Sequence, residues 1–176
     1  MKALITGGSG QLGWELQRCI PKNWQVFAPS SSELNLTDSA AITATLERLQ
    51  PHLVINGAAS TAVDQAEQDK ELTDAVNNVG VGRLAEASRQ VGARFIHIST
   101  DFIFDGVKSR PYLPYDLPRP TGRYGASKLE GEKRVREIYG NQALIIRTAW
   151  VYSAHGSNFV KTMLRFMKVR EELGII

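Results

Sequence analysis

The sequence has a single cysteine, Cys19, in 176 residues. One cysteine excludes an internal disulfide and a metal cluster held by several thiolates. Because Cys19 continues an apolar pattern that includes Leu12 and Leu16, we expect it to be buried as a small hydrophobic residue. The histidines are scattered without the spacing of metal ligands, so no metal site is predicted.

The sequence also lacks long apolar runs and blocks of like charge. No apolar stretch is long enough to span a bilayer, and the N-terminal MKALITGG lacks the long apolar core of a signal peptide. Lys and Arg number 21 against 18 Asp and Glu, which gives a net charge of +3. This balance gives no reason to expect nucleic acid or a membrane as partner, whereas it suits an anionic small molecule. We therefore expect a cytoplasmic protein.

What the sequence does contain is an alternation of strand and helix patterns. The predicted strands cover residues 2–6, 25–29, 53–56, 94–99 and 143–147, and the predicted helices cover residues 11–19, 39–49, 72–91 and 127–139. Several of the strands are apolar at successive positions, which is typical of strands buried on both faces of a parallel sheet. The alternation predicts right-handed βαβ units and an α/β fold of the Rossmann type, a doubly wound parallel sheet with helices on both faces. Residues 1–176 are expected to form one such domain.

Two segments fall outside the alternation. Residues 109–120, SRPYLPYDLPRP, hold four of the seven prolines and predict a long loop, a feature that in compact domains is usually either functional or disordered. Residues 158–173 are predicted to be a helix, and the GII that follows resembles the beginning of another strand. We therefore expect that the chain is part of a longer protein.

The stretch TGGSGQLG, residues 6–13, joins the first strand to the first helix. Gly7, Gly10 and Gly13 form the pattern G-x-x-G-x-x-G in the strand–turn–helix context of a dinucleotide site. Gly7 permits the tight turn, Gly10 lets backbone N–H groups approach a pyrophosphate, and Gly13 allows the helix to pack closely on the strand. We predict dinucleotide binding here rather than a merely structural turn.

The end of the second strand is where a dinucleotide's adenosine ribose would lie. Ser30 begins a run of serines that can bond either a hydroxyl or a phosphate, and Glu33 could reach the ribose, but no arginine adjoins them. The choice between NADPH and NADH therefore stays open. Asn35, Leu36 and Asp38 are candidate contacts of the adenine. For Asp38, the role of a helix cap is an equally good interpretation.

The third strand is followed by small residues in NGAAS, residues 56–60. Small side chains at the carboxyl end of a strand leave room for a cofactor backbone. Ala58, Ala59 and Ser60 are therefore candidate cofactor contacts, and close packing of a helix is the other explanation of their size.

The fourth strand ends in STDFIFDG, where Ser99 and Thr100 place hydroxyls at the carboxyl edge of the sheet. Tyr124 and Lys128, in YGASK, are one helical turn apart and share a face. A cation held nearby lowers the pKa of a tyrosine, and an oxidised nicotinamide would add a second positive charge. Tyr124 could then give a proton to a carbonyl oxygen as hydride reaches the carbon, or take one in reverse, while Thr100 polarises the same oxygen.

The strings TGGSGQLG, STDFIFDG and YGASK, in this order, resemble the extended short-chain dehydrogenase/reductase superfamily. The resemblance continues through NGAASTAVDQAE, AVNNVGVGRLAEAS, IIRTAWVYS and NFVKTML, and is strongest to the dTDP-4-dehydrorhamnose reductase family. It implies the reduction, in nucleotide-sugar biosynthesis, of the 4-keto group of a small-molecule substrate, dTDP-4-dehydro-L-rhamnose, with NADPH or NADH.

The resemblance also implies a role for each matching residue. Thr100 matches the hydroxyl partner, Tyr124 the proton donor, Lys128 the ribose-binding base and Asn77 the helix asparagine that holds a water-linked proton relay. The cofactor contacts match at Gly10, Gln11, Leu12, Ala58, Ala59 and Ser60.

Substrate contacts match at Asp101 and Trp150, although Trp150 also fits core packing after a strand. The chain departs from the usual family pattern at Ser60, Asn35 and Phe102; the first two leave the cofactor preference open, and Phe102 removes a hydroxyl from the substrate loop. Family members are longer, so the resemblance implies that the C-terminal substrate-binding region is missing. A homodimer of the full-length protein and a Mg²⁺ ion stay open, although no metal ligand is predicted.

Two other functions remain as alternatives. A nucleotide-sugar epimerase or dehydratase of the same superfamily would change the sugar without net consumption of cofactor. A non-catalytic protein that resembles the regulatory subunit of methionine adenosyltransferase would bind a partner enzyme and show no turnover.

Overall fold

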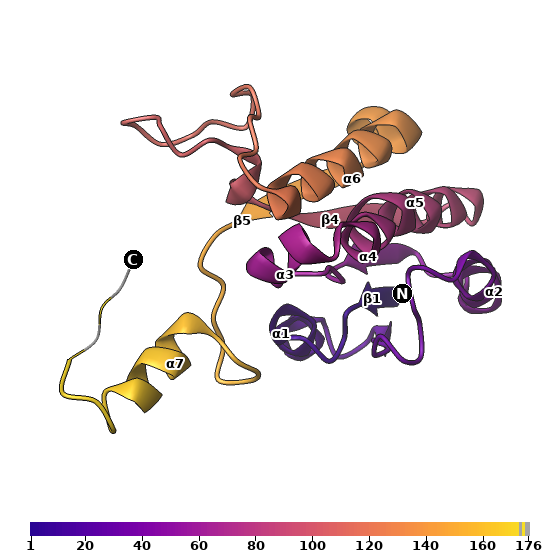
Figure 1. The fold of residues 1–176 in the computed structure, drawn as a ribbon. Coiled ribbons are helices and arrows are strands. Elements are labelled where there is room, and N and C mark those ends of the chain that lie inside the picture. Colours follow the sequence, from indigo (N-terminus) through magenta and orange to yellow (C-terminus); the bar gives the residue numbers. More distant parts are fainter. Residues whose placement is uncertain (173, 175–176) are drawn as a thin grey trace.

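A parallel sheet forms the centre of the molecule. In the computed structural model, which describes residues 1–172 and 174, five strands lie in the order β2-β1-β3-β4-β5 (Figure 1). They are β1 Lys2–Thr6, β2 Gln25–Phe27, β3 Leu53–Asn56, β4 Arg94–Thr100 and β5 Leu144–Thr148. The register aligns Thr6 with Asn56, and Asn56 with His97, so the carboxyl ends of the central strands lie at one edge. The predicted doubly wound α/β fold is confirmed.

Helices connect these strands. Within the described residues they are α1 Gln11–Cys19, α2 Ser39–Leu49, α3 Val63–Gln68, α4 Lys70–Asp74, α5 Val81–Gln90, α6 Arg123–Tyr139 and α7 Phe159–Phe166. A π-helix, η1 Ala75–Gly80, joins α4 to α5, and the 3₁₀ turns are η2 Asp101–Ile103 and η3 Gly140–Gln142. α5 packs against both α2 and α6, whereas α1 packs against β1. In the part of the chain that the structure describes, no helix is long and apolar enough to cross a membrane.

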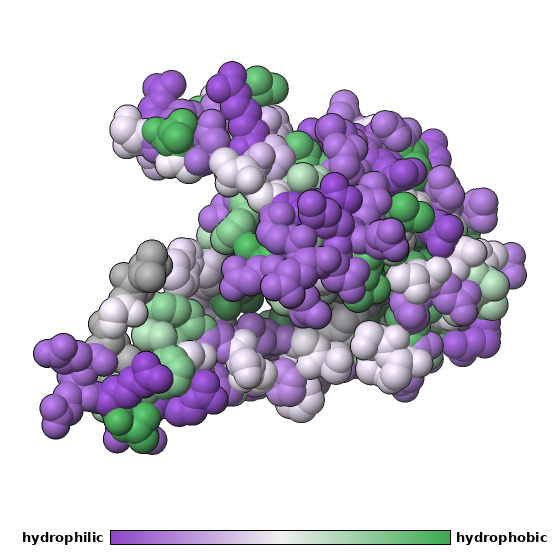
Figure 2. All heavy atoms as spheres, in the orientation of Figure 1, coloured by the Kyte–Doolittle hydropathy of each residue, from purple (hydrophilic) through white to green (hydrophobic). Residues whose placement is uncertain are grey.

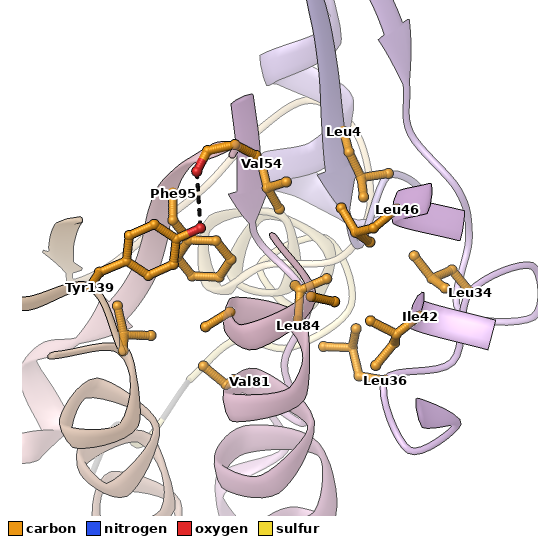
Figure 3. Packing of buried hydrophobic residues seen from close by; sticks show 14 of the residues in the cluster. Leu4, Leu34, Leu36, Ile42, Leu46, Val54, Val81, Leu84, Phe95 and Tyr139 are labelled. Carbon is orange, nitrogen blue, oxygen red and sulfur yellow. Dashed lines mark hydrogen bonds between the residues drawn. The ribbon is translucent and has the colours of Figure 1, made fainter. Parts of the chain in front are cut away.

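The main core lies between the sheet and the layer formed by α2, α5 and α6. Leu4 of β1 and Phe95 of β4 are buried there against Leu84 of α5 (Figure 3). The dashed line in Figure 3 is the bond of 3.0 Å that the Tyr139 hydroxyl donates to the main-chain oxygen of Ala93. Burying one such large apolar side chain contributes about 1.5–3 kcal/mol, so this layer fixes the strands whose ends carry the site.

The opposite face of the sheet is covered unevenly. Successive side chains of a strand point to opposite faces, and Ile5 of β1 is buried on the side away from the main core. On β5, in contrast, Leu144 is 55% exposed and Ile146 is 38% exposed. α7 also presents exposed apolar side chains, among them Phe159 and Leu164, and Figure 2 shows apolar atoms on that helix. The apolar surface of the described residues is thus concentrated after the fourth strand.

Most predicted elements are present, with α1, α2, β1 and β3 at the predicted bounds. Asp38 is the cap of α2, because its Oδ1 accepts a bond of 2.9 Å from the main-chain N–H of Ala41. The proline-rich segment is a loop, as predicted, and it extends from the body in Figure 1. It has contacts of its own: Tyr112 stacks on Phe104 at 4.2 Å between ring centroids and donates to Asp105 at 2.7 Å.

Several predicted bounds are wrong. The helix predicted at 72–91 begins at Lys70 and contains the π-helix η1, and α3 was not predicted. α6 begins at Arg123 rather than at residue 127, because its cap, Gly122, makes no side-chain bond that would mark the start in the sequence. α7 ends at Phe166, well before residue 173. The strand expected from GII falls on residues 174–176 and lies largely outside the described residues.

The prediction that Cys19 is buried is also wrong, since its side chain is exposed. Gly13 is the buried residue of α1, and a Cβ on it would lie 2.2 Å from the Gly7 oxygen. Cys19 comes six residues later, about 240° around a helix of 3.6 residues per turn, so it points away from that contact.

Candidate functional site

A cavity of about 520 Å³ opens at the carboxyl edge of the sheet. The glycine turn, the ends of β3 and β4, the first turns of α6 and the segment after β5 line it. The structure thus brings together most of the predicted site residues. Those that line the cavity are Gly7, Gly10, Gln11, Leu12, Gly13, Ala58, Ala59, Thr100, Asp101, Tyr124, Lys128 and Trp150.

The glycine turn forms one end of this cavity. Gly7 has a φ of +72°, a conformation that favours glycine, and a Cβ on it would lie 2.9 Å from the Ala58 nitrogen. The Gly10 N–H donates to the Gly7 oxygen at 3.0 Å, and Gly10 caps α1 without a side chain. The start of α1 therefore lies at the cavity, and no side chain of the cap bonds its first N–H groups, an arrangement that suits phosphate groups.

Beyond β2, Ser31 lines the cavity and Ser30 does not. The Ser30 hydroxyl donates to Glu33 at 2.7 Å, and the same carboxylate oxygen accepts from the Ser30 N–H at 2.8 Å. These two bonds, the main-chain one first, hold the pKa of Glu33 below its usual value. Asn35 bonds within its own turn, and Leu36 is buried in the core. Ser30, Asn35 and Leu36 are therefore not brought to the cavity.

Thr100, Tyr124 and Lys128 converge from β4 and α6. Thr100 ends β4 and is 5% exposed, while Tyr124 lies in the first turn of α6 and is half-buried. Lys128, one turn later, is buried, and its ammonium donates to the main-chain oxygen of Ile98 at 2.7 Å. The hydroxyl, the phenol and the ammonium thus line one cavity, which is the arrangement expected from the sequence.

Burial shifts the pKa of both titratable groups. It lowers the pKa of Lys128 to about 8, an effect that the Glu132 carboxylate partly offsets. Burial also raises the pKa of Tyr124; the Thr100 hydroxyl acts against this shift, and the Asp101 carboxylate adds to it. The sequence led us to expect a neighbouring cation to lower the pKa of Tyr124. The structure gives the opposite direction, because burial of the phenol is the larger effect.

The Asn77 side chain links the segment after β3 to α6 next to the cavity. It lies in the π-helix η1, is fully buried, and its Oδ1 accepts from the Ser60 N–H at 2.9 Å. Its Nδ2 donates to the Ser60 oxygen at 3.0 Å and to the Ser127 hydroxyl at 3.1 Å. The Ser127 hydroxyl in turn donates to the main-chain oxygen of Tyr124 at 2.9 Å. Asn77 and Ser60 therefore contact the site through the backbone and do not line the cavity themselves.

A second buried chain of polar groups was not predicted. The Thr6 hydroxyl donates to Asn56 at 2.6 Å, and the Asn56 amide lies 3.1 Å from Nδ1 of His97, so the chain crosses β1, β3 and β4. His97 is fully buried, and burial, followed by the charge of Lys128, holds its pKa well below the usual value of 6.5. This histidine is therefore neutral beside the lysine.

Trp150 forms an outer wall of the cavity with Asp101 and Phe102. It is 71% exposed, so the alternative that it packs in the core is wrong. Its φ is +54°, a region that residues other than glycine seldom adopt, and its ring meets that of Phe159 edge-on at 5.0 Å. The Phe102 ring lies 5.6 Å from that of Tyr124. Exposed aromatic side chains thus border the cavity.

Other lining residues were missed by the sequence analysis. Their residue types do not by themselves indicate a site. Only their position next to strand ends or next to predicted site residues could have identified them. They are Ser9, Thr61, Val63, Ile98, Thr148, Ala149 and Val151. Within the described residues, no three His, Cys, Asp or Glu side chains come together as metal ligands do.

Comparison with known proteins gives a consistent result. The model of the RmlD substrate binding domain family matches residues 1–176. A dTDP-4-dehydrorhamnose reductase of Burkholderia thailandensis is 46% identical over 176 residues, which are 100% of this chain and 59% of that protein. A protein of the same name from Escherichia coli K12 is 41% identical over 100% of this chain and 60% of its own length. The chain thus spans about three fifths of the length of these curated relatives.

A solved structure is similarly close. It is a dTDP-4-dehydrorhamnose reductase of Bacillus anthracis in complex with NADP, 39% identical to this chain, with a TM-score of 0.94. The match covers 98% of this chain and 61% of that one. The similarity in fold therefore extends over nearly all of the present chain.

Proposed function

The chain belongs to the RmlD substrate binding domain family, and we propose that the full-length protein is a reductase of the 4-keto group of dTDP-4-dehydro-L-rhamnose. NADPH or NADH is the reductant, and dTDP-L-rhamnose is the product. The observation that supports this most strongly is that Thr100, Tyr124 and Lys128 line the same cavity as the glycine turn. The names of the curated relatives support the choice of substrate.

The residues present fit a dinucleotide. Side chains at Gly7 and Gly13 would collide with the protein's own backbone, so glycine at both positions is what allows the turn to pack this tightly at the start of α1. Gly10, Gln11 and Leu12 would hold the pyrophosphate at the start of α1, with Ala58 and Ala59 on the other side of the cofactor. We propose on this basis that residues 1–176 form the NAD(P)-binding domain. When bound, the reduced nicotinamide supplies hydride to the carbonyl carbon.

The protein's own residues manage the proton. Tyr124, whose raised pKa keeps it protonated near neutrality, donates its hydroxyl proton to the oxygen of the ketone as that oxygen gains charge, so the ketone becomes an alcohol. Thr100 donates a hydrogen bond to the same oxygen. The Lys128 ammonium stabilises the phenolate that Tyr124 becomes. Asp101 and Trp150, on the outer wall, contact the sugar nucleotide.

An assay of cofactor oxidation tests this function. The full-length protein should consume NADPH or NADH steadily with dTDP-4-dehydro-L-rhamnose, and it should consume neither with a dTDP-sugar that has no keto group. Conversion of the sugar without net oxidation of cofactor would identify an epimerase or dehydratase instead. No turnover, together with co-purification of a methionine adenosyltransferase, would identify a regulatory subunit.

A further inference from the structure

A loop between β5 and α7 lies against the cofactor-binding turn. We call residues 153–158 the clasp loop; Figure 1 shows it turning back towards α1 before α7 begins. His155 stacks on Trp14 of α1 at 4.4 Å between ring centroids, and its Nε2 lies 3.0 Å from the oxygen of Ser9. The Ser153 hydroxyl donates to Glu15 at 2.5 Å. These contacts join positions about 140 residues apart in the sequence.

The last residue of the clasp loop, Asn158, has an amide whose orientation is determined by its partners. Its Oδ1 accepts a bond of 3.0 Å from the Lys161 N–H, and so Asn158 caps α7. A backbone N–H can only donate, so the oxygen must face it and Nδ2 must be the donor on the other side. Nδ2 donates to the main-chain oxygen of Ser153 at 2.8 Å and to Oε1 of Gln11 at 2.8 Å.

The bond from Asn158 in turn determines the orientation of the Gln11 amide. Because its Oε1 is the acceptor of the Asn158 bond, its Nε2 is the end of the amide that remains as a donor. Gln11 is the first residue of α1 and lines the cavity next to Gly10. The clasp loop also holds its stem, since a Cβ on Gly156 would lie 2.9 Å from Cγ of Gln11. Phosphate oxygens only accept hydrogen bonds, so this orientation suits a pyrophosphate.

We propose that Asn158 is a positioning residue for the cofactor: it orients the Gln11 amide so that Nε2 donates to the pyrophosphate of the bound dinucleotide. This inference rests on the proposed function, which supplies the dinucleotide. Asn158 then contributes to two elements: its Oδ1 caps α7, and its Nδ2 sets the orientation of the Gln11 amide at the start of α1. The helix that follows β5 is thereby linked to cofactor affinity.

The variant Asn158→Asp tests the inference in the full-length protein. Aspartate caps helices as well as asparagine does, but its carboxylate has no hydrogen to donate. Gln11 must then turn Nε2 toward residue 158 and present Oε1 to the phosphates. We expect the Kd for NADPH, measured by titration of its fluorescence, to rise about tenfold. The KM for NADPH should rise by a similar factor, and kcat at saturating NADPH should fall by less.

Two controls separate orientation from charge and folding. Ser157→Asp adds the same charge one residue away on an exposed position and should change the Kd by less than about twofold. In a Gln11→Met background, Asn158→Asp should have little further effect, because no amide is left to invert. Asn158→Ser keeps a cap but is too short to hold Gln11, and it gives a second measurement if the aspartate variant does not fold.

The outcomes distinguish this inference from the proposed function. An unchanged Kd in Asn158→Asp would overturn the inference, as would an equal loss with and without Gln11. A wild-type protein that binds neither NADPH nor NADH would instead overturn the proposed function. A loss that disappears in the Gln11→Met background supports the positioning role.

Discussion

At the scale of single residues, the surroundings of Tyr124 suit the role of proton donor that we propose for it. Burial and the nearby carboxylate of Asp101 raise its pKa, so the phenol stays protonated over the neutral range. A reductase needs the acid form at the start of each turnover, and the raised pKa therefore suits the direction of reaction that we propose. In the proposed mechanism, Lys128 stabilises the phenolate that forms as the proton leaves Tyr124.

Tyr124→Phe removes the transferable proton and little else. We expect reduction by the full-length protein to fall by a factor of at least about 100, which is the usual contribution of a general acid. NADPH affinity, followed by fluorescence titration, should stay within about threefold of the wild type, because the ring that packs at 5.6 Å from Phe102 is kept. Turnover near the wild-type rate would show that another group donates the proton.

From the lowered pKa of Lys128 we predict a loss of activity at alkaline pH. Its pKa of about 8 means that the ammonium loses its proton as the pH rises through that value, and the phenolate of Tyr124 then loses its stabilising cation. We expect kcat/KM for reduction, which reports the titrating groups of the free enzyme, to decline above about pH 8. Lys128→Met should be slow at every pH and show no decline in this range. A decline that persists in Lys128→Met would assign the titration to a different group.

The meeting of Thr100, Tyr124 and Lys128 at one cavity could be predicted, because a Ser-Thr at the end of a strand and a Tyr-x-x-x-Lys on a helix each carry a signal of their own. His97 could not, since a histidine inside an apolar strand has no local feature that marks a bond to Asn56 on the next strand. The same holds for Asn158, whose partner Gln11 is 147 positions away. Contacts between residues so far apart in the sequence appear only in the folded structure.

At the scale of elements, α6 is seated by two glycines. A Cβ on Gly125 would lie 2.1 Å from the oxygen of Phe102 in η2, and one on Gly131 would lie 2.3 Å from the oxygen of Asn77 in η1. The helix backbone therefore approaches both short segments closely. This approach brings Ser127 within reach of the Asn77 amide and sets Tyr124 and Lys128 at the cavity.

Gly131→Ala tests this close approach. In an exposed helix the change would stabilise by about 1 kcal/mol, but here the methyl group meets backbone, and we expect a loss of about 1–3 kcal/mol. Gly82→Ala on α5 is a matched control, since its nearest neighbour is the flexible Arg134 side chain at 2.7 Å. Urea unfolding measures both free energies. Equal effects of the two substitutions would contradict the proposed role of the α6–η1 contact.

Element type was largely predictable and element detail was not. Strands and helices such as β1 and α2 follow from apolar periodicity and from a cap such as Asp38. The π-helix η1 could not be told from the rest of a long helix by apolar periodicity, and so it was not predicted. Its extra residue per turn is a matter of backbone bonding, which periodicity does not report.

At the scale of the whole molecule, His97 makes stability depend on pH. Folding lowers its pKa well below 6.5, so in acid the unfolded chain binds a proton that the folded protein does not. The free energy of unfolding must therefore fall as the pH drops below about 6.5, by up to about 1.4 kcal/mol per pH unit. His97→Gln, which can still accept the bond from Asn56, should flatten this slope in urea titrations. An unchanged slope would exclude His97 as its source.

Cys19 offers a practical handle on the molecule. It is the one thiol of the sequence, it is exposed, and it ends the nine-residue helix whose first turn lines the cavity. A helix of that length is about 13 Å long, so a maleimide dye on Cys19 would lie within energy-transfer range of a bound reduced nicotinamide. The position that leaves this sulfur outside the core thus makes it a labelling point from which cofactor occupancy can be followed optically, without altering any residue that lines the cavity.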